Sequence, residues 1–421
     1  MRLINEKYRA LKPTVDYLTD EVVIAQAWKK THSYIRSFNW YADTLELDTS
    51  ALCIEENAKI WAQELEDNKS ISELELVPAA KSEHWTISKR GWQPLDARGK
   101  KIPLRPLAHI QVRDQTWATA VMMCLADAVE TAQGDCSEPN FEKARSKGIY
   151  SYGNRLLCDW NKDGKAWFRW GNSEVYRKFF TDYQNFLKRP LVLGREVANV
   201  TAGNEEVFIV NLDLSKFYNT IDNQLLIERL IKISNQFHNS EKPESQFWNR
   251  VRAVFGWKWR EEDESRAKEI GFKQKDIALG LPQGLVSSGF FANAYLNEFD
   301  KEIGRRLGDE LNAKSNIVLH DYCRYVDDIR LVVSAESDAA SVVKETVNKF
   351  IDDKLKSFGG KKLELNFEKT KINVRSDLDN DGSMSNRVKL IQSDLSGPSD
   401  RDSIESISGI LENLLSVEPE T

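Results

Sequence analysis

Two adjacent acids between apolar runs constrain the fold of this chain most strongly. Asp327 and Asp328 follow Tyr325-Val326, with Ile317-Val318-Leu319 before them and Leu331-Val332-Val333 after them. Short runs rich in β-branched residues on both sides of a polar centre predict a β-hairpin with the acids at its turn. Two like charges held together are unfavourable unless a cation neutralises them. The pair is therefore a candidate metal site, with an ordinary acidic turn as the alternative.

A third acid ends an apolar run farther upstream. Residues 207–213 have the length and composition of a buried strand, and Asp213 stands where the run stops. The stretch that follows, including Tyr218, predicts a turn that enters a helix. One acid at a strand end and two at a hairpin provide the hard oxygen ligands that Mg²⁺ prefers. Two such ions about 3.5–4 Å apart can clamp the attacking and leaving oxygens of a phosphoryl transfer.

Together these motifs resemble those of the reverse transcriptases, in which an aromatic residue follows the strand-end Asp by five positions and a Tyr-x-Asp-Asp comes later. Further stretches are similar to elements of the same family, and the resemblance covers roughly residues 95 to 375. Two positions depart from the pattern. Asn154 replaces the usual Phe of a Ser-Tyr-Gly-Phe-Arg element, and Gly289 stands where a Pro is common in group II intron enzymes. The similar stretches are residues 101–115, 150–155, 278–296 and 363–371.

The resemblance implies an α+β right-hand polymerase fold, with fingers and a palm built on an antiparallel sheet. We expect a helical N-terminal extension over residues 1–85, fingers over 86–200 and the palm with the catalytic motifs over 201–375. Residues 376–421 are expected to form a C-terminal tail or the start of a thumb, so that the thumb is short or incomplete. Pro190 is expected to end an aromatic-rich element, because proline interrupts helices.

The resemblance also implies roles for the matching residues. The expected catalytic residues are Asp213, Asp327 and Asp328, and with Leu214 they are the expected ligands of two Mg²⁺ ions. Tyr218 is expected to pack under the nucleotide sugar and exclude a 2′ hydroxyl, with a core tyrosine as the alternative. The full set of expected nucleotide-binding residues is Arg105, Lys101, Tyr218, Gln283, Gly284 and Lys369.

A basic stretch stands out because the whole chain carries a net charge of −6. Between residues 89 and 113, seven basic residues face one acid, Asp96, and tryptophans lie in and beside the stretch. Basic residues interleaved with aromatics suit a path for nucleic-acid phosphates and bases. A structural ion pair with Asp114 is the alternative for Arg113. The expected nucleic-acid-binding residues are Lys89, Arg90, Arg98, Lys100 and Arg113.

The implied activity is RNA-directed DNA polymerisation, with an RNA template, a DNA product and dNTPs as partners. By elimination, the chain is most similar to the bacterial defence-associated and abortive-infection enzymes. A group II intron-like or retron-like enzyme, an RNA-dependent RNA polymerase and a non-catalytic RNA-binding scaffold stay open. A dedicated non-coding RNA, a second protein and a second copy of this chain are further possible partners. No signal peptide and no membrane span are evident, and a cytoplasmic location is expected. The five cysteines form no CxxC pair, so neither a zinc site nor a disulfide framework is expected.

Overall fold

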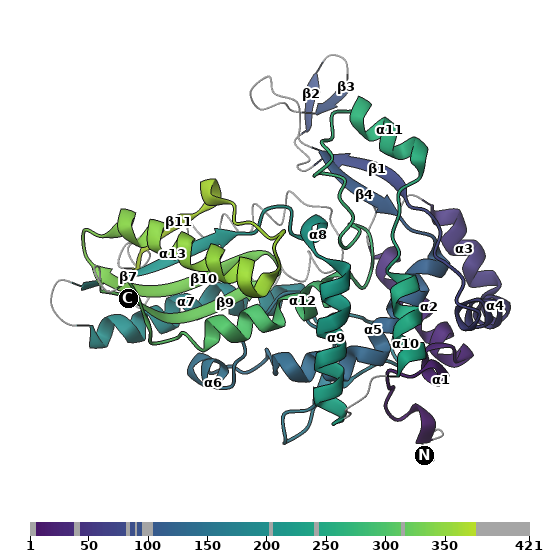
Figure 1. The fold of residues 1–421 in the computed structure, drawn as a ribbon, viewed down its shortest axis with the longest axis horizontal. Helices are drawn as coiled ribbons and strands as arrows, with labels where there is room; N and C mark the ends of the chain where they lie inside the picture. Colours follow the sequence, from purple (N-terminus) through teal and green to yellow (C-terminus); the bar gives the residue numbers. More distant parts are fainter. Residues whose placement is uncertain are drawn as a thin grey trace, which may run out of the picture.

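The computed structural model describes residues 6–37, 43–80, 85–88, 91–94, 104–201, 205–239, 244–312 and 316–375 (Figure 1). Helices and antiparallel strands are mixed along the chain, which agrees with the predicted α+β class. The predictions for Lys89, Arg90, Arg98, Lys100 and Lys101, and those for the tail 376–421, lie outside the described residues.

Helices build the half of the molecule that contains the N-terminal segment (Figure 1). The long helix α5 is its axis, and 18 of its 22 residues are buried. A helix that is apolar on every side needs neighbours all round, and α2, α9, α10 and α12 supply them. The helices of this half are α1 (Val15–Leu18), α2 (Glu21–Arg36), α3 (Thr44–Leu52), α4 (Ile54–Glu66), α5 (Val112–Gln133), α9 (Asn223–His238), α10 (Ser245–Val254) and α11 (Glu261–Glu269).

A two-stranded ladder projects from this half together with α11 (Figure 1). It pairs β1 (Glu75–Ala80) with β4 (Leu104–His109), and a separate hairpin pairs β2 (Trp85–Ser88) with β3 (Gly91–Pro94). The segment 1–85, for which a helical extension is expected, thus also contains strands, and its last α-helix ends at Glu66. The reason is local, because Leu74-Glu75-Leu76 alternates apolar and polar residues with the period of a strand.

A five-stranded antiparallel sheet forms the other half, in the order β11-β7-β10-β9-β8. The expected strand ending at Asp213 is confirmed as β7. The expected hairpin around the two acids is confirmed as β9 and β10, joined by a turn at Val326 and Asp327. The strands are β7 (Glu205–Asp213), β8 (Glu310–Asn312), β9 (Ile317–Tyr325), β10 (Asp328–Glu336) and β11 (Lys371–Val374).

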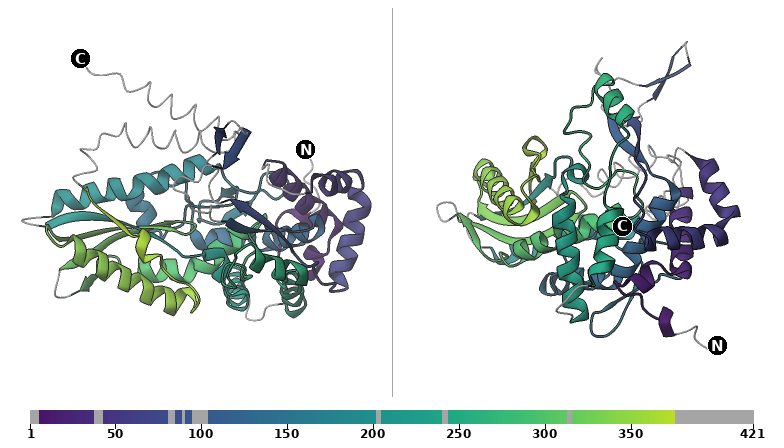
Figure 2. Two further views of the ribbon diagram at one scale, coloured as in Figure 1. Left: turned by 90° about the horizontal axis from the view of Figure 1, so that it is seen from above. Right: turned by 45° about the vertical axis from the view of Figure 1, so that its right-hand side comes forward.

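Helices cover both faces of this sheet (Figure 2). One face carries Leu331 and Val333 of β10, which share a core with Val347 of α13 (Ala340–Lys354) and with α12 (Ser288–Gly304). The opposite face carries Val332, which packs with Val197 of α7 (Phe179–Val200). Alternate residues of β10 therefore enter two different cores, and the acids lie at the end of the strand, outside both.

Pro190 does not end its element as expected, because it lies inside α7. A proline inside a helix removes one backbone hydrogen bond. Burial offsets this loss, since Arg189, Pro190, Leu193 and Val197 are all buried in the described structure. Arg189 also donates to both carboxylate oxygens of Asp321 in β9, at 2.8 and 2.7 Å, which fixes the helix on the sheet.

The remaining elements are short connections. They are α6 (Phe141–Ser146), α8 (Phe217–Thr220), the pair β5 (Cys158–Trp160) and β6 (Ala166–Phe168), the 3₁₀ turns Glu6–Tyr8 and Phe367–Lys369, and the wide turn Leu355–Gly359. Among the described helices, none combines the length and apolar character that crossing a membrane requires.

Candidate active site

The antiparallel ladder brings the three predicted acids together. Asp213, the last residue of β7, is the direct partner of Asp328, the first residue of β10. Directly opposed residues of such a ladder have Cβ atoms about 4.5–5.5 Å apart on one face of the sheet. Asp327 lies in the adjoining turn, and its carbonyl oxygen accepts a hydrogen bond from the Leu214 N–H at 3.1 Å. The site therefore combines a strand end, a strand start and a turn.

The electrostatics of these acids match a cation site. Burial, and next the carboxylate of Asp328, raise the pKa of Asp327 to about 6. Desolvation and the carboxylate of Asp213 raise the pKa of Asp328. Both shifts mean that the ionised carboxylates are disfavoured here, first by burial and then by one another. The donor set consists of hard oxygens, which suits Mg²⁺, and Leu214 can contribute its main-chain oxygen.

The turn that carries Asp327 has an unusual backbone. Val326 has φ +55°, in the left-handed region that β-branched residues avoid. Arg324 fixes this turn, because its Nη1 donates to the Val326 carbonyl oxygen at 2.9 Å. Arg324 is itself fully buried and is held by both oxygens of Asp300, at 3.0 and 2.7 Å. A strained turn with this support presents its acids in one conformation.

Lys369 lies at the same edge as the acids. Its Nζ atom is 3.0 Å from Oδ2 of Asp213, and the Lys369 side chain is 62% exposed. Sequence reasoning missed its neighbour Asn366, whose main-chain N–H donates to the Asp213 carbonyl oxygen at 2.8 Å. The Asn366 side-chain amide also lies 3.4 Å from Oδ2 of Asp213. An amide three residues before the lysine, within the recognised stretch 363–371, was the available signal.

Tyr218 lies on the short helix α8, just beyond the strand end. The Tyr218 side chain is partly buried, and its main-chain oxygen accepts a hydrogen bond from the Leu281 N–H at 2.8 Å. Its hydroxyl accepts one from Nδ2 of Asn154 at 3.4 Å. The ring is therefore held at both ends, close to the acids, and burial raises the pKa of the hydroxyl above its ordinary value.

The Gln283–Gly284 loop links α8 with β4. The Gln283 side-chain amide donates to Oδ1 of Asn219 at 2.8 Å, and the Gln283 carbonyl accepts from the Ala108 N–H at 2.7 Å. Gly284 has φ +129°, a backbone conformation that needs glycine. The Gly284 carbonyl accepts from Nε2 of Gln115 at 2.7 Å. These bonds hold the loop between the acid-bearing half and the projecting ladder.

The two described arginines of the basic stretch differ in their surroundings. Arg105 is exposed on β4, and its guanidinium has no hydrogen bond or ion pair with the described residues. Arg113 is tied to Asp114 at 2.8 Å and to Glu64 at 3.2 Å, and it stacks on Trp117 at 4.4 Å. These contacts favour the structural ion pair for Arg113 over nucleic-acid binding.

A cluster of Asp43, Glu46 and His109 brings three metal-ligating groups within 4.8 Å of one another. Both acids already cap helices. Asp43 accepts from the Glu46 N–H at 2.8 Å, and Glu46 accepts from the Val112 N–H at 2.7 Å. The positive ends of α3 and α5 therefore point at these carboxylates, which stabilises the acids and acts against a bound cation.

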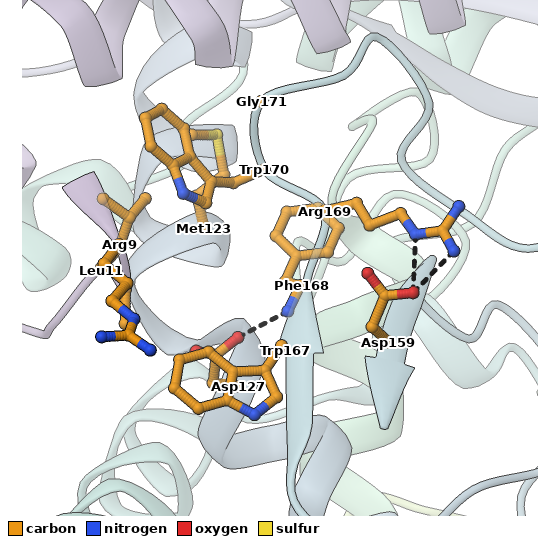
Figure 3. A pocket seen from close by; sticks show the side chains of 11 residues that line it. Arg9, Leu11, Met123, Asp127, Asp159, Trp167, Phe168, Arg169, Trp170 and Gly171 are labelled. Carbon is orange, nitrogen blue, oxygen red and sulfur yellow. Dashed lines mark hydrogen bonds and ion pairs between the residues drawn. The ribbon is translucent and has the colours of Figure 1, made fainter. Parts of the chain in front are cut away.

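A cavity of about 220 Å³ lies between the N-terminal segment, α5 and the β5–β6 hairpin (Figure 3). Asp127 on its wall accepts a hydrogen bond from the Phe168 N–H at 2.7 Å, and Arg169 is paired with Asp159 at 2.6 Å. Burial raises the pKa of Asp127 to about 6. None of the predicted site residues lines this cavity, so it is separate from the acid site.

Comparison with known proteins bears on the acid site. A family model described as "Reverse transcriptase (RNA-dependent DNA polymerase)" matches residues 175–390, just over half of the chain. The matched range includes β7, α12, the β9–β10 hairpin and the Lys369 turn. A search of curated proteins finds no match.

Proposed function

Because the chain belongs to the reverse transcriptase family and is an RNA-directed DNA polymerase, we propose that Asp213, Asp327 and Asp328 are its catalytic residues. The pairing of Asp213 with Asp328 across the ladder, with Asp327 in the adjoining turn, carries this proposal. Enzymes of this family use divalent metal ions, and the oxygen donors at this edge fit two Mg²⁺. When bound, such ions activate the primer 3′ hydroxyl and stabilise the charge that develops on the leaving pyrophosphate.

In this proposal the chain's own residues orient the reactants. Asp213 and Asp327 hold the metal ligand positions, with the main-chain oxygen of Leu214, and Asp328 assists them. Lys369 neutralises the triphosphate and can donate a proton to the leaving group. Its position beside Asp213 supports this role, since the ammonium already lies at the edge where the phosphates must sit.

The nucleotide and the nucleic acid then lie between the two halves. We assign the five-stranded sheet to the palm and the two-stranded ladder of β1 and β4 to the fingers. Residues 376–421 are assigned to a tail or the start of a thumb. Exposed Arg105, with Lys101, binds the triphosphate. Gln283 and Gly284 lie against the nascent base pair, which their fixed loop supports. The basic residues Lys89, Arg90, Arg98 and Lys100 hold the template–primer.

Tyr218 selects the sugar in this proposal, because a ring beneath the sugar leaves no room for a 2′ hydroxyl. The test is incorporation of paired dNTP and NTP substrates on an RNA template. Tyr218→Ala should lower the preference for dNTP by about tenfold to several hundredfold. Tyr17→Ala, a matched change on α1, should keep the preference. An unchanged ratio of dNTP to NTP incorporation in Tyr218→Ala contradicts sugar selection by Tyr218. A wild-type enzyme that prefers NTP contradicts the assignment of deoxynucleotides as substrates.

For the biological role, we propose anti-phage defence in the cytoplasm, with an associated non-coding RNA as template. The departures at Asn154 and Gly289 from residues common in related bacterial enzymes support a separate subgroup. Cells that carry wild-type protein or Asp327→Ala are compared for phage plating, and the nucleic acid that co-purifies is sequenced. Protection lost in the variant, with one enriched RNA, agrees with the proposal. Equal plating, or random cellular RNA, contradicts it.

A further inference from the structure

Asn154 and Gly289, each noted above as a departure from a pattern of related enzymes, lie against each other. A Cβ atom at Gly289 would stand 2.4 Å from Nδ2 of Asn154 and 2.6 Å from its Cγ. Heavy atoms that are not bonded do not approach this closely. The Asn154 side chain can therefore occupy its place only because residue 289 is glycine.

The backbone also fixes the direction of the Asn154 side chain. Asn154 has φ +50°, a left-handed conformation that asparagine tolerates better than most residues. Asn293, buried in α12, donates from Nδ2 to the carbonyl oxygens of Gly153 and Asn154 at 2.6 and 3.2 Å. Oδ1 of Asn293 in turn accepts from Arg324, which holds the turn of Asp327. One side chain of α12 thus fixes both the Asn154 segment and the acid-bearing hairpin.

The Asn154 amide points at Tyr218. Its Nδ2 donates to the Tyr218 hydroxyl at 3.4 Å, while the main-chain oxygen of Tyr218 is held by Leu281. Gly280 contacts the same carbonyl, since a Cβ there would lie 2.3 Å from the Tyr218 oxygen. The ring is accordingly fixed at its main chain and at its hydroxyl.

We propose that Asn154 is a specificity-determining residue that selects deoxyribonucleotides together with Tyr218. The inference rests on the proposed function, in which the Tyr218 ring packs beneath the nucleotide sugar. A ring that is held only at its main chain can turn to another rotamer when a 2′ hydroxyl enters. A ring whose hydroxyl is also held cannot relieve the clash in this way. The net contribution of one hydrogen bond between neutral groups changes the equilibrium between two rotamers of the ring by about two- to tenfold.

A double-mutant cycle tests the pair. Asn154→Gly removes the side chain and suits the positive φ, and Tyr218→Phe removes only the hydroxyl. Each should lower the dNTP-over-NTP preference by about two- to tenfold, and the double variant should lose no more than the larger single loss. Full retention of preference in either single variant, or losses that multiply in the double variant, overturns the proposal. Asn68→Gly, at φ +58° far from the site in sequence, is the matched control and should keep the preference.

A reciprocal change tests the role of Gly289. Gly289→Ala should lower the preference as Asn154→Gly does, because its Cβ displaces the Asn154 amide. In an Asn154→Gly background the same change should cause no further loss, and a further loss overturns the proposal. Both substrates are measured on one preparation, so partial unfolding does not alter the ratio. Suppose that Tyr218→Ala lowers the preference but Asn154→Gly and Tyr218→Phe do not. Tyr218 then excludes the 2′ hydroxyl as proposed, but Asn154 has no part in the selection. If Tyr218→Ala also has no effect, the result contradicts both the role of Asn154 and the sugar selection proposed for Tyr218.

Discussion

The Nζ atom of Lys369 lies 3.0 Å from Oδ2 of Asp213, although 156 positions separate the two residues in the chain. The contact joins the 3₁₀ turn Phe367–Lys369, which precedes β11, to the end of β7. It places one positive charge among three carboxylates, where burial and then the neighbouring acids raise the pKa of Asp327 and Asp328. In the proposed site, the lysine thus competes with a metal ion for one oxygen of Asp213.

Replacement of Lys369 should therefore have opposite effects on metal binding and on catalysis. Lys369→Gln frees Asp213, so Mg²⁺ binding to the enzyme without nucleotide should tighten by about two- to fivefold, as for an exposed ion pair. Nucleotide incorporation should fall, because the triphosphate loses a positive charge. Metal titration and single-turnover incorporation measure the two effects. Lys361→Gln, an exposed lysine nearby, should change neither, and tighter metal binding with unchanged incorporation would contradict the role at the triphosphate.

The raised pKa of Asp327 predicts how the metal-free protein responds to pH. An acid whose pKa is higher in the folded than in the unfolded chain stabilises the fold at low pH, and this contribution is lost as the pH rises through the folded value. The free energy of unfolding should thus lose on the order of 1–2 kcal/mol between about pH 4 and pH 6 through this residue. Mg²⁺ should offset the loss, so its stabilising effect should grow with pH.

Thermal unfolding of wild type and Asp327→Asn, with and without Mg²⁺, measures this dependence. Asparagine does not titrate, so the variant without metal should show a smaller loss over this pH range. A stabilisation by Mg²⁺ that is equal at pH 5 and pH 7.5 in the wild-type protein would contradict the assignment of Asp327 to the metal site.

The sequence predicted the acid site because its parts follow from local patterns. The alternating and apolar runs around Asp213 and Asp327 predict strands that end at acids, and the antiparallel ladder then needs only one register to unite them. The helical half was harder. The alternation of apolar and polar residues at Leu74-Glu75-Leu76 is short and follows a series of helices, and the pairing of residues 75–80 with β4 is a long-range contact.

Buried polar groups were the other part that sequence reasoning missed. Pro190 was expected to end a helix, because no local pattern predicts its burial inside α7. Arg324 lies between apolar strand residues, and a charge in such a place indicates a buried partner, but nothing in the sequence identifies that partner as Asp300. Asn154 and Gly289 were recognised as departures from the family, while their contact depends on how α12 packs on the hairpin.

The turn of Asp327 should be sensitive to the residue packed behind it. A Cβ at Gly153 would lie 2.7 Å from Cγ2 and 2.8 Å from the main-chain nitrogen of Val326, so Gly153→Ala must shift the turn. A displacement of about 1 Å at a reacting group costs up to about 100-fold in rate. We expect kcat to fall by about ten- to hundredfold. Gly171→Ala, where no described atom lies within 4 Å, should keep kcat, and equal kcat in both variants would contradict the role of this packing.

The basic stretch should supply most of the affinity for nucleic acid, because the chain as a whole is negative. Reversal of Arg98, Lys100 and Lys101 to Glu should weaken RNA binding at least tenfold. It should also reduce the slope of log K against log salt by about 2, the value for three phosphate contacts on a single strand. Fluorescence anisotropy at several salt concentrations measures both quantities.

Two comparisons complete that experiment. Reversal of Lys344, Lys349 and Lys361 should leave the affinity and its slope nearly unaltered. Arg113→Gln should lower thermal stability more than RNA affinity, because its guanidinium is engaged by Glu64 and Asp114. If reversal of the basic stretch has no larger effect than reversal of the other lysines, the stretch is only a solvated surface.

Single-turnover primer extension on an RNA template, with dNTPs and Mg²⁺, tests the assignment of the three acids most directly. Asp213→Asn, Asp327→Asn and Asp328→Asn each keep the size of the side chain and remove one charge. Asp163→Asn in the β5–β6 turn is the matched control, and circular dichroism verifies that all four variants fold. We predict that each of the three loses most of its extension rate, by about 100-fold or more, while the control keeps the wild-type rate. Wild-type rates in any two of the three folded variants would contradict the active site proposed for this enzyme.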